Sequence, residues 1–302
     1  MNVALYLATV LIWGTTWLAI YYQLGEVPVS VSVFYRFALA ALIMVLGMRL
    51  LGRLQATNRR DHLYLLLQGG CLFSFNFICF YTATETVASG LVSVVFSLAS
   101  IFNAVNNRLI WKEPIPPRVL VAGVIGAVGL MLLFWPEVDA DEMGLEAAEG
   151  VALAVLGTYL FSLGNMITRR NGAVGLHPTT TNTYAMVYGT LILGLLLVVT
   201  GQPLVMPSSG AYLPALLYLS VFGSVIGFTT YLMLVNRVGP NHAAYATVMF
   251  PVIALFLSSL YEGYVWHTAS FIGLGLVLAG NLVLVWKGRK LIRLQLGARD
   301  GR

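Results

Sequence analysis

The chain has 302 residues, of which 59% are hydrophobic and only 10% are charged. Soluble domains carry about 25% charged residues, so this composition excludes an ordinary soluble protein and indicates a chain that crosses a membrane several times. The formal net charge is +5, which in a soluble protein would raise the question of nucleic-acid binding.

Ten apolar stretches follow one another with short polar gaps between them, and little chain is left for a soluble domain. Each is close to the roughly 20 residues that a helix needs to cross a hydrocarbon core. The first has no basic n-region and is too long for a signal-peptide h-region, so we predict an uncleaved span. The predicted transmembrane helices lie at residues 3–22, 32–51, 62–82, 87–109, 117–135, 148–168, 179–200, 212–235, 243–261 and 268–286.

Basic residues occur in every second gap. Lys and Arg follow the second, fourth, sixth, eighth and tenth helices, whereas the gaps after the odd-numbered helices contain neither. Because positive charge stays on the cytoplasmic side of a membrane, both termini are predicted to be cytoplasmic. The net charge is then an orientation signal, and no nucleic-acid partner is expected.

The chain contains an internal repeat. The segment 80–113 resembles 230–262, and Tyr81 aligns with Tyr231 at an offset of 150 residues. Each half holds five helices, and because five is odd the second half enters the membrane from the opposite side, as in many secondary transporters. The predicted units are the first five-helix repeat (1–139), the second, inverted repeat (140–288) and a basic cytoplasmic tail (289–302).

Several motifs resemble the EamA-type family of the drug/metabolite transporter superfamily. They are the opening IWGTTWLAI, the FYRF start of the second helix, and the YTA to WKEP module with its second copy ending in YEG. The resemblance covers residues 4–286 and implies an all-α membrane protein of ten helices in two inverted repeats (5+5). It also implies a transporter of amino acids or other small metabolites, with helices 1, 3, 4, 6, 8 and 9 around a central cavity. YddG-type aromatic amino-acid exporters are the functional comparison.

Trp13 and Trp17 lie near the middle of the first helix, one turn apart and on one face. They could simply pack between helices, but repeat interfaces at the midplane are where transporter sites form, and we favour the wall of a cavity. The other predicted substrate-binding residues lie near the centres of the implied cavity helices: Asn76, Phe77, Ser93, Ser97, Tyr159, Asn165, Ser224, Phe228, Tyr245 and Met249.

These candidates differ in how strongly their chemistry points to a ligand. A buried carboxamide without a partner is costly, which favours Asn76 and Asn165, whereas serines are ordinary packing residues in membrane helices. Pro251 in the ninth helix removes a backbone hydrogen bond, and the resulting kink could be a gate hinge or a fixed bend. The motifs AGVIGAVG and GLGLVLAG predict close helix packing, within the monomer or between subunits.

Acidic residues are absent from the central part of every predicted helix, and the four histidines lie near the membrane edges. Proton relays and cation sites in membranes use such groups. We therefore predict a facilitator or weakly coupled carrier with an uncharged, ring-lined cavity for neutral, zwitterionic or bulky apolar solutes. No metal site or cofactor is expected, and the sequence has no H-E-x-x-H pattern or phosphate loop that would indicate an enzyme.

Arg36 is the only basic residue outside a cytoplasmic gap, about a turn and a half inside the second helix on the outer side. Its long side chain can snorkel or bind a carbonyl or a glutamate, and Glu26 and Glu85 lie on the same side. We predict a structural role in which it locks this helix to a neighbouring loop. The alternative is contact with a substrate carboxylate.

Together these features predict a monomeric, alternating-access exporter of small organic metabolites in a bacterial inner membrane. A nucleotide-sugar or sugar-phosphate carrier is the main alternative, although such a site should present Lys or Arg at the midplane. A passive pore is the second alternative.

Overall fold

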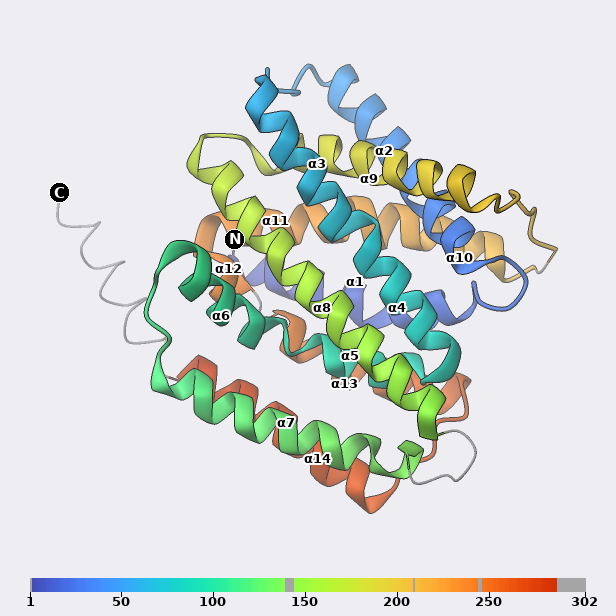
Figure 1. Cartoon of the computed structure of the whole chain (residues 1–302), viewed down its shortest axis with the longest axis vertical. Coiled ribbons are helices and arrows are strands. Elements are labelled where there is room, and N and C mark those ends of the chain that lie inside the picture. Colours follow the sequence, from blue (N-terminus) through green and yellow to red (C-terminus); the bar gives the residue numbers. More distant parts are fainter. Residues whose placement is uncertain (1, 139–143, 209, 244–245, 287–302) are drawn as a thin grey trace.

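The computed structural model describes residues 2–138, 144–208, 210–243 and 246–286, and these residues form helices joined by short loops, without a strand among them (Figure 1). The helices are α1 (Asn2–Tyr21), α2 (Val29–Leu50), α3 (Arg59–Phe73), α4 (Phe75–Thr86), α5 (Ser89–Phe96), α6 (Ala99–Trp111), α7 (Pro117–Val138), α8 (Gly144–Ala173), α9 (Pro178–Thr200), α10 (Tyr212–Tyr218), η1 (Leu219–Ile226), α11 (Gly227–Val238), α12 (Pro240–Ala243), α13 (Ala246–Tyr261) and α14 (Thr268–Trp286).

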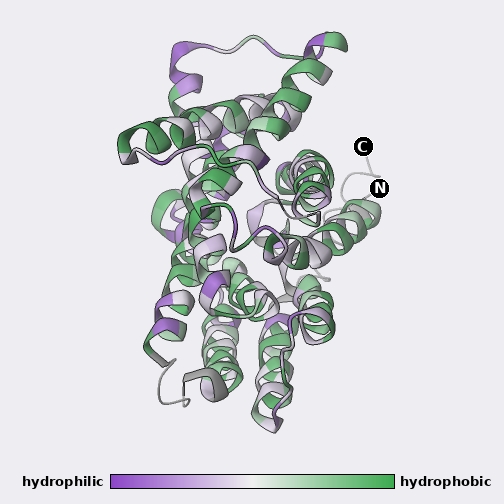
Figure 2. Ribbon diagram, turned by 90° about the vertical axis from the view of Figure 1, so that its right-hand side faces the viewer, coloured by the Kyte–Doolittle hydropathy of each residue, from purple (hydrophilic) through white to green (hydrophobic). Residues whose placement is uncertain are grey.

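Eight helical stretches of the described chain are long and apolar enough to cross a membrane, and two shorter apolar helices, Met249–Tyr261 and Thr268–Val283, lie where the ninth and tenth are predicted. Hydrophobic residues colour most of the ribbon in Figure 2, and hydrophilic ones gather near helix ends and loops. The prediction of an all-helical chain that crosses a membrane therefore agrees with the structure.

The predicted third and fourth helices are each interrupted, which is a correction to the sequence analysis. The third divides into α3 and α4 at Ser74, whose backbone is not helical (φ −134°, ψ −89°). Its hydroxyl donates to the carbonyls of Gly69 (3.2 Å) and Gly189 (3.0 Å) on α9, so the interruption is held by a neighbouring helix. The fourth divides into α5 and α6 at residues 97–98.

The predicted eighth helix also changes geometry along its length. Between α10 and α11 the chain forms a π-helix, η1, over Leu219–Ile226. Here hydrogen bonds run over five residues instead of four, a geometry that is frequent at functional sites. Ser220 and Ser224, both buried, face α2: Ser220 Oγ donates to the carbonyl of Arg36 at 3.1 Å.

Helix contacts between the two halves come in matching pairs. α1 packs against α13 as α8 packs against α6, and α1 packs against α11 as α8 packs against α3 and α4. α2 packs against α9, and α7 against α14, so each of these helices meets its own counterpart. A pseudo-two-fold axis between the predicted repeats would give this pattern of contacts, so the pattern is consistent with the predicted duplication.

The α7–α14 pair lies along one side of the molecule (Figure 1) and depends on two glycines. A Cβ atom built on Gly129 would lie 2.7 Å from the carbonyl oxygen of Gly273, and one built on Gly273 would lie 2.5 Å from that of Gly129. The backbones are therefore in contact, as small residues allow in membrane helices. This places the predicted glycine packing within the monomer.

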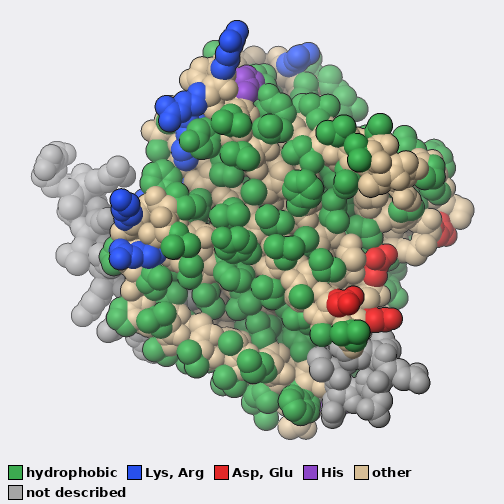
Figure 3. Space-filling view, viewed as in Figure 1, with side chains coloured by type: hydrophobic (Ala, Val, Ile, Leu, Met, Phe, Trp, Pro, Cys, Tyr) green, Lys and Arg blue, Asp and Glu red, His purple; other side chains and the backbone are tan. Residues whose placement is uncertain are grey.

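Charged side chains separate to opposite ends of the face shown in Figure 3, with Lys and Arg toward the upper left and Asp and Glu toward the lower right. At the basic end, two consecutive arginines of α8 form ion pairs with helices of the first half. Arg169 Nη2 lies 2.6 Å from Glu113 Oε1, and Arg170 Nη1 lies 3.0 Å from Asp61 Oδ1. The two ion pairs fasten α8 to the beginning of α3 and to the chain after α6.

The Asp61–Arg170 pair is the less exposed of the two ion pairs, so we expect it to contribute more to the stability of the fold. We expect Asp61→Asn to lower the free energy of unfolding by about 1.5–3 kcal/mol, because a hydrogen bond to a charged group is lost in a largely buried place. Glu113→Gln serves as the control, since Glu113 and Arg169 are 42% and 32% exposed and such pairs contribute about 0–1 kcal/mol. Thermal unfolding in detergent measures both, and an equal or larger loss in Glu113→Gln would contradict this ranking.

A cavity of aromatic rings with one buried arginine

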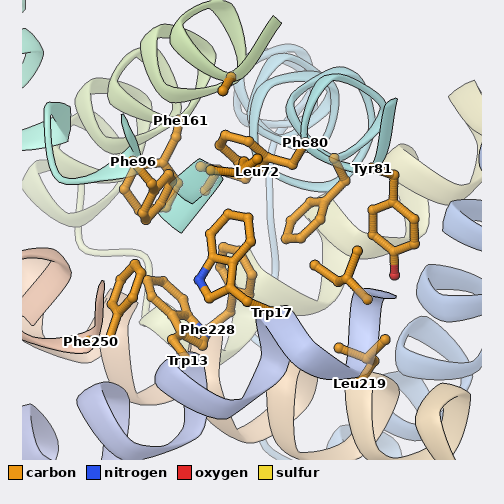
Figure 4. Close-up of a cluster of buried hydrophobic side chains, with 14 of the residues drawn as sticks. Trp13, Trp17, Leu72, Phe80, Tyr81, Phe96, Phe161, Leu219, Phe228 and Phe250 are labelled. Carbon is orange, nitrogen blue, oxygen red and sulfur yellow. The ribbon is translucent and has the colours of Figure 1, made fainter. Parts of the chain in front are cut away.

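Aromatic side chains from both halves of the chain converge in the middle of the bundle (Figure 4). The ring centroid of Trp13 lies 4.9 Å from Tyr231 and 5.0 Å from Phe228. The ring of Trp17 lies 5.5 Å from that of Phe80. These distances fall within the range in which aromatic pairs stabilise one another beyond simple burial.

A small cavity lies among these rings. Its volume is about 30 Å³, room for about two water molecules, since one needs about 10–15 Å³ by this measure. A solute of the size of an amino acid can enter only if the surrounding helices move apart. The lining residues are Trp13, Thr16, Trp17, Ile20, Arg36, Asn76, Phe77, Phe80, Phe96, Phe161, Phe228 and Phe250.

The lining residues come from α1, α2, α4 and α5 of the first half and from α8, α11 and α13 of the second. α1 contributes four lining residues, Trp13, Thr16, Trp17 and Ile20. Because their spacings are those of successive helical turns, they share one face of α1. The cavity therefore lies between the halves. Apart from α2, these are the helices that the family resemblance implies.

Arg36 reaches this cavity, which corrects two predictions. Its side chain is 2% exposed, Nε donates to Ser224 Oγ at 2.9 Å and Nη1 to the Tyr81 hydroxyl at 3.3 Å. Its Cζ lies 4.4 Å from the centre of the Phe77 ring. The predicted contact with a glutamate and a loop is therefore wrong, because the side chain turns inward toward α4 and η1, and the cavity is not uncharged.

Asn76 presents an unsatisfied carboxamide to the same cavity. It is 0% exposed, and neither Oδ1 nor Nδ2 has a hydrogen-bond partner among the described residues. Asn76 and Arg36 both line this small cavity, so the carboxamide and the guanidinium border the same space. A buried amide without partners is costly and is a strong indication that a ligand completes its hydrogen bonds.

Other predicted site residues lie around the cavity without lining it. Ser224 contacts Arg36, while Asn165 Nδ2 donates to the Tyr231 hydroxyl at 2.9 Å, behind the ring that packs on Trp13. Pro251 lies within α13, next to the lining residue Phe250.

The remaining predicted residues that the structure describes make their contacts outside the cavity lining. Ser93 donates to the carbonyl of Gly90, and Ser97 Oγ accepts from Asn281 of α14 at 3.5 Å. Tyr159 packs against Phe102, and Met249 is 56% exposed on the outer surface of α13. Tyr245 is outside the described residues.

The sequence analysis missed six lining residues. Thr16 and Ile20 share the face of Trp13 and Trp17, and Phe80 lies one turn after Phe77, so helical spacing alone could have identified these three. Phe96 lies three residues after Ser93, and Phe161 lies one turn before Asn165, so the same spacing relates these two to predicted residues. Only Phe250 had no such signal.

Comparison with known proteins gives the same architecture. A solved crystal structure superimposes with a TM-score of 0.70 at 16% identity, covering 95% of this chain and 98% of that one, and so shares the fold. The uncharacterized inner membrane transporter YedA of Escherichia coli K12 is 26% identical over 291 residues, covering 94% of this chain and 90% of YedA. Protein PagO of Salmonella typhimurium LT2 is 25% identical over 287 residues, covering 89% of this chain and 87% of PagO.

The family itself is identified by two matches. The sequence model of the EamA-like transporter family matches residues 1–135 and, a second time, residues 148–286. One match falls within each predicted repeat, and together they include every lining residue of the cavity. The chain belongs to the EamA-like transporter family.

Proposed function

We propose that this protein exports small organic metabolites, amino acids and related hydrophobic compounds in particular, across a bacterial inner membrane. The cavity between the halves carries the proposal, because it lies among membrane-spanning helices and is lined by residues of both predicted repeats. Aromatic rings suit an apolar side chain, while Arg36 and Asn76 suit the polar groups of an amino acid. The basic end of the molecule is the cytoplasmic one in this proposal, with both termini on that side and a monomer as the working unit.

Alternating access is the mechanism that we propose. The cavity has little free space, so substrate binding requires that the halves rock or bend apart on one side at a time. None of the lining residues is acidic or a histidine, and this supports a facilitator or a weakly coupled carrier. The ion pairs of Arg169 and Arg170 cross between the halves at the basic end and would have to separate when that side opens.

Arg36 gives some support to the alternative of a nucleotide-sugar or sugar-phosphate carrier, because that class requires a cation in the cavity. A phosphate ester brings up to two negative charges, however, and Arg36 is the one cation among the described lining residues. A single carboxylate matches this charge better, so amino acids remain the preferred substrates.

Counterflow in proteoliposomes tests the proposed function. We expect uptake of labelled phenylalanine to saturate and to accelerate several-fold when the vesicles are preloaded with unlabelled amino acid, because a carrier returns faster when loaded. A protonophore should leave exchange unchanged. Protein-free vesicles are the control, and flux that neither saturates nor responds to preloading would indicate a passive pore instead.

A further inference from the structure

Arg36 carries a charge that the described part of the protein does not neutralise. The described ion pairs are Arg169–Glu113 and Arg170–Asp61, whereas the acceptors of Arg36 are the neutral hydroxyls of Ser224 and Tyr81. Among described residues none accepts from Nη2. A charged group inside a membrane protein usually pairs with another or marks a substrate path, and here the missing partner is an anion.

The two residues that hold the guanidinium also leave one side of it open to the cavity. Ser224 binds Nε from η1, and Tyr81 binds Nη1 from α4 while donating its own hydrogen to Gln23 Oε1 at 2.7 Å. The Phe77 ring supports the flat face of the group. The guanidinium is therefore fixed in orientation before any ligand arrives, which lowers the cost of binding a carboxylate.

Asn76 supplies the second half of the site. Its Oδ1 can accept from an ammonium or hydroxyl, and its Nδ2 can donate to an oxygen, yet both lack partners in a fully buried position. The cavity beyond these groups is bounded by rings, among them Trp17, Phe96 and Phe250. Arg36 and Asn76 thus present polar groups to a cavity whose walls are otherwise mainly aromatic rings.

We propose that Arg36 and Asn76 form a carboxylate subsite, so that this carrier accepts organic monocarboxylates with an apolar body and rejects amines and cations that lack the acid group. The inference rests on the proposed transport function and restricts its substrate class. The guanidinium binds the carboxylate, and Asn76 binds the group on the neighbouring carbon, such as an α-ammonium. Bulky apolar cations, which an uncharged cavity would admit, are repelled by Arg36.

A series of compounds with the same ring tests the subsite in the unaltered protein. L-Phenylalanine has both polar groups, 3-phenylpropionate only the carboxylate, 2-phenylethylamine only the amine, and phenyl phosphate a dianion. We expect the two carboxylates to compete for phenylalanine counterflow and the amine to be at least about 100-fold weaker, the effect of leaving a buried charge unpaired. Equal competition by the amine, or stronger competition by phenyl phosphate, would overturn the proposal.

Substitutions of Arg36 and Asn76 test whether these residues bind the substrate or only support the fold. Arg36→Gln should weaken carboxylate competition about 100-fold while relieving the rejection of phenylethylamine, a reversal that a structural role would not produce. Asn76→Leu should reduce the preference for phenylalanine over phenylpropionate and leave the requirement for a carboxylate.

Ser224→Ala removes one support of Arg36 but keeps its charge, so selectivity against the amine should persist. If Ser224→Ala loses that selectivity as fully as Arg36→Gln, the charge is not what selects substrates.

Direct binding distinguishes failure of the subsite from failure of the proposed function. Purified protein in detergent should unfold at higher temperature with 3-phenylpropionate and not with phenylethylamine, and Arg36→Lys, which keeps the charge, should retain part of this response. Stabilisation by the acid without counterflow would leave the subsite standing and remove the transport proposal. Counterflow of phenylalanine together with equal stabilisation by the acid and the amine would leave the transport proposal standing and remove the carboxylate subsite.

Discussion

Replacing Gly273 with valine is expected to force α14 away from α7 and to leave little folded protein. A Cβ at this position would lie 2.5 Å from the carbonyl oxygen of Gly129, 2.7 Å from the amide nitrogen of Leu133 and 3.0 Å from its Cα. These are backbone atoms, which cannot rotate aside as a side chain can. We expect a loss at or above the upper end of the about 1–3 kcal/mol that overpacking usually costs.

The same helix provides the control. Gly275 lies two residues further along α14, is exposed, and has nothing within 4 Å of a built Cβ. Gly275→Val should therefore keep the yield and the unfolding temperature of the unaltered protein, measured by size-exclusion chromatography and thermal unfolding in detergent. Comparable loss in both variants would mean that helix contact is not what Gly273 provides.

Trp13→Ala is expected to have the second large effect, on stability and transport together. The indole packs against five other rings, and its Nε1 donates to the carbonyl of Gly223 at 3.2 Å. Removing a buried indole costs about 3–5 kcal/mol, and the rings of α5, α8 and α11 would lose a packing partner that they share. We expect counterflow of phenylalanine to fall below detection at equal amounts of reconstituted protein.

Trp135→Ala is the matched control, because Trp135 belongs to α7 and is 64% exposed. The same change of residue there should alter neither the unfolding temperature nor the counterflow rate appreciably. Trp13→Phe keeps a ring but loses the donor to Gly223, so it should retain more stability than alanine. Normal transport by Trp13→Ala would contradict a central role for this indole.

The gross fold was predictable because it follows from averages over many residues. Hydropathy located the helical stretches, and the basic residues in every second gap indicated how successive helices alternate in direction. The interruption at Ser74 was not predictable in this way, because the bonds that stabilise it come from Gly69 and from Gly189 on another helix. The π-helix likewise changes the hydrogen-bond pattern without changing the hydropathy.

The cavity was predictable where a helix presents several of its residues, as α1 does with Trp13 and Trp17. Arg36 shows why the rest was not. The sequence placed Arg36 within the second helix, but the direction of a long side chain depends on which neighbours face it. Here Ser224 and Tyr81, both distant in sequence, receive the guanidinium and bring it inside.

The π-helical segment fixes how many residues this part of the chain must contain. Deleting one residue between Leu219 and Ile226 would turn everything after it by about 100°, the angle per residue of a helix. Phe228 and Tyr231 would then leave the ring cluster, while Ser224 would lose its alignment with Arg36. An insertion or a deletion in η1 would therefore break the register between the residues that hold Arg36 and the ring of Phe228 that lines the same cavity.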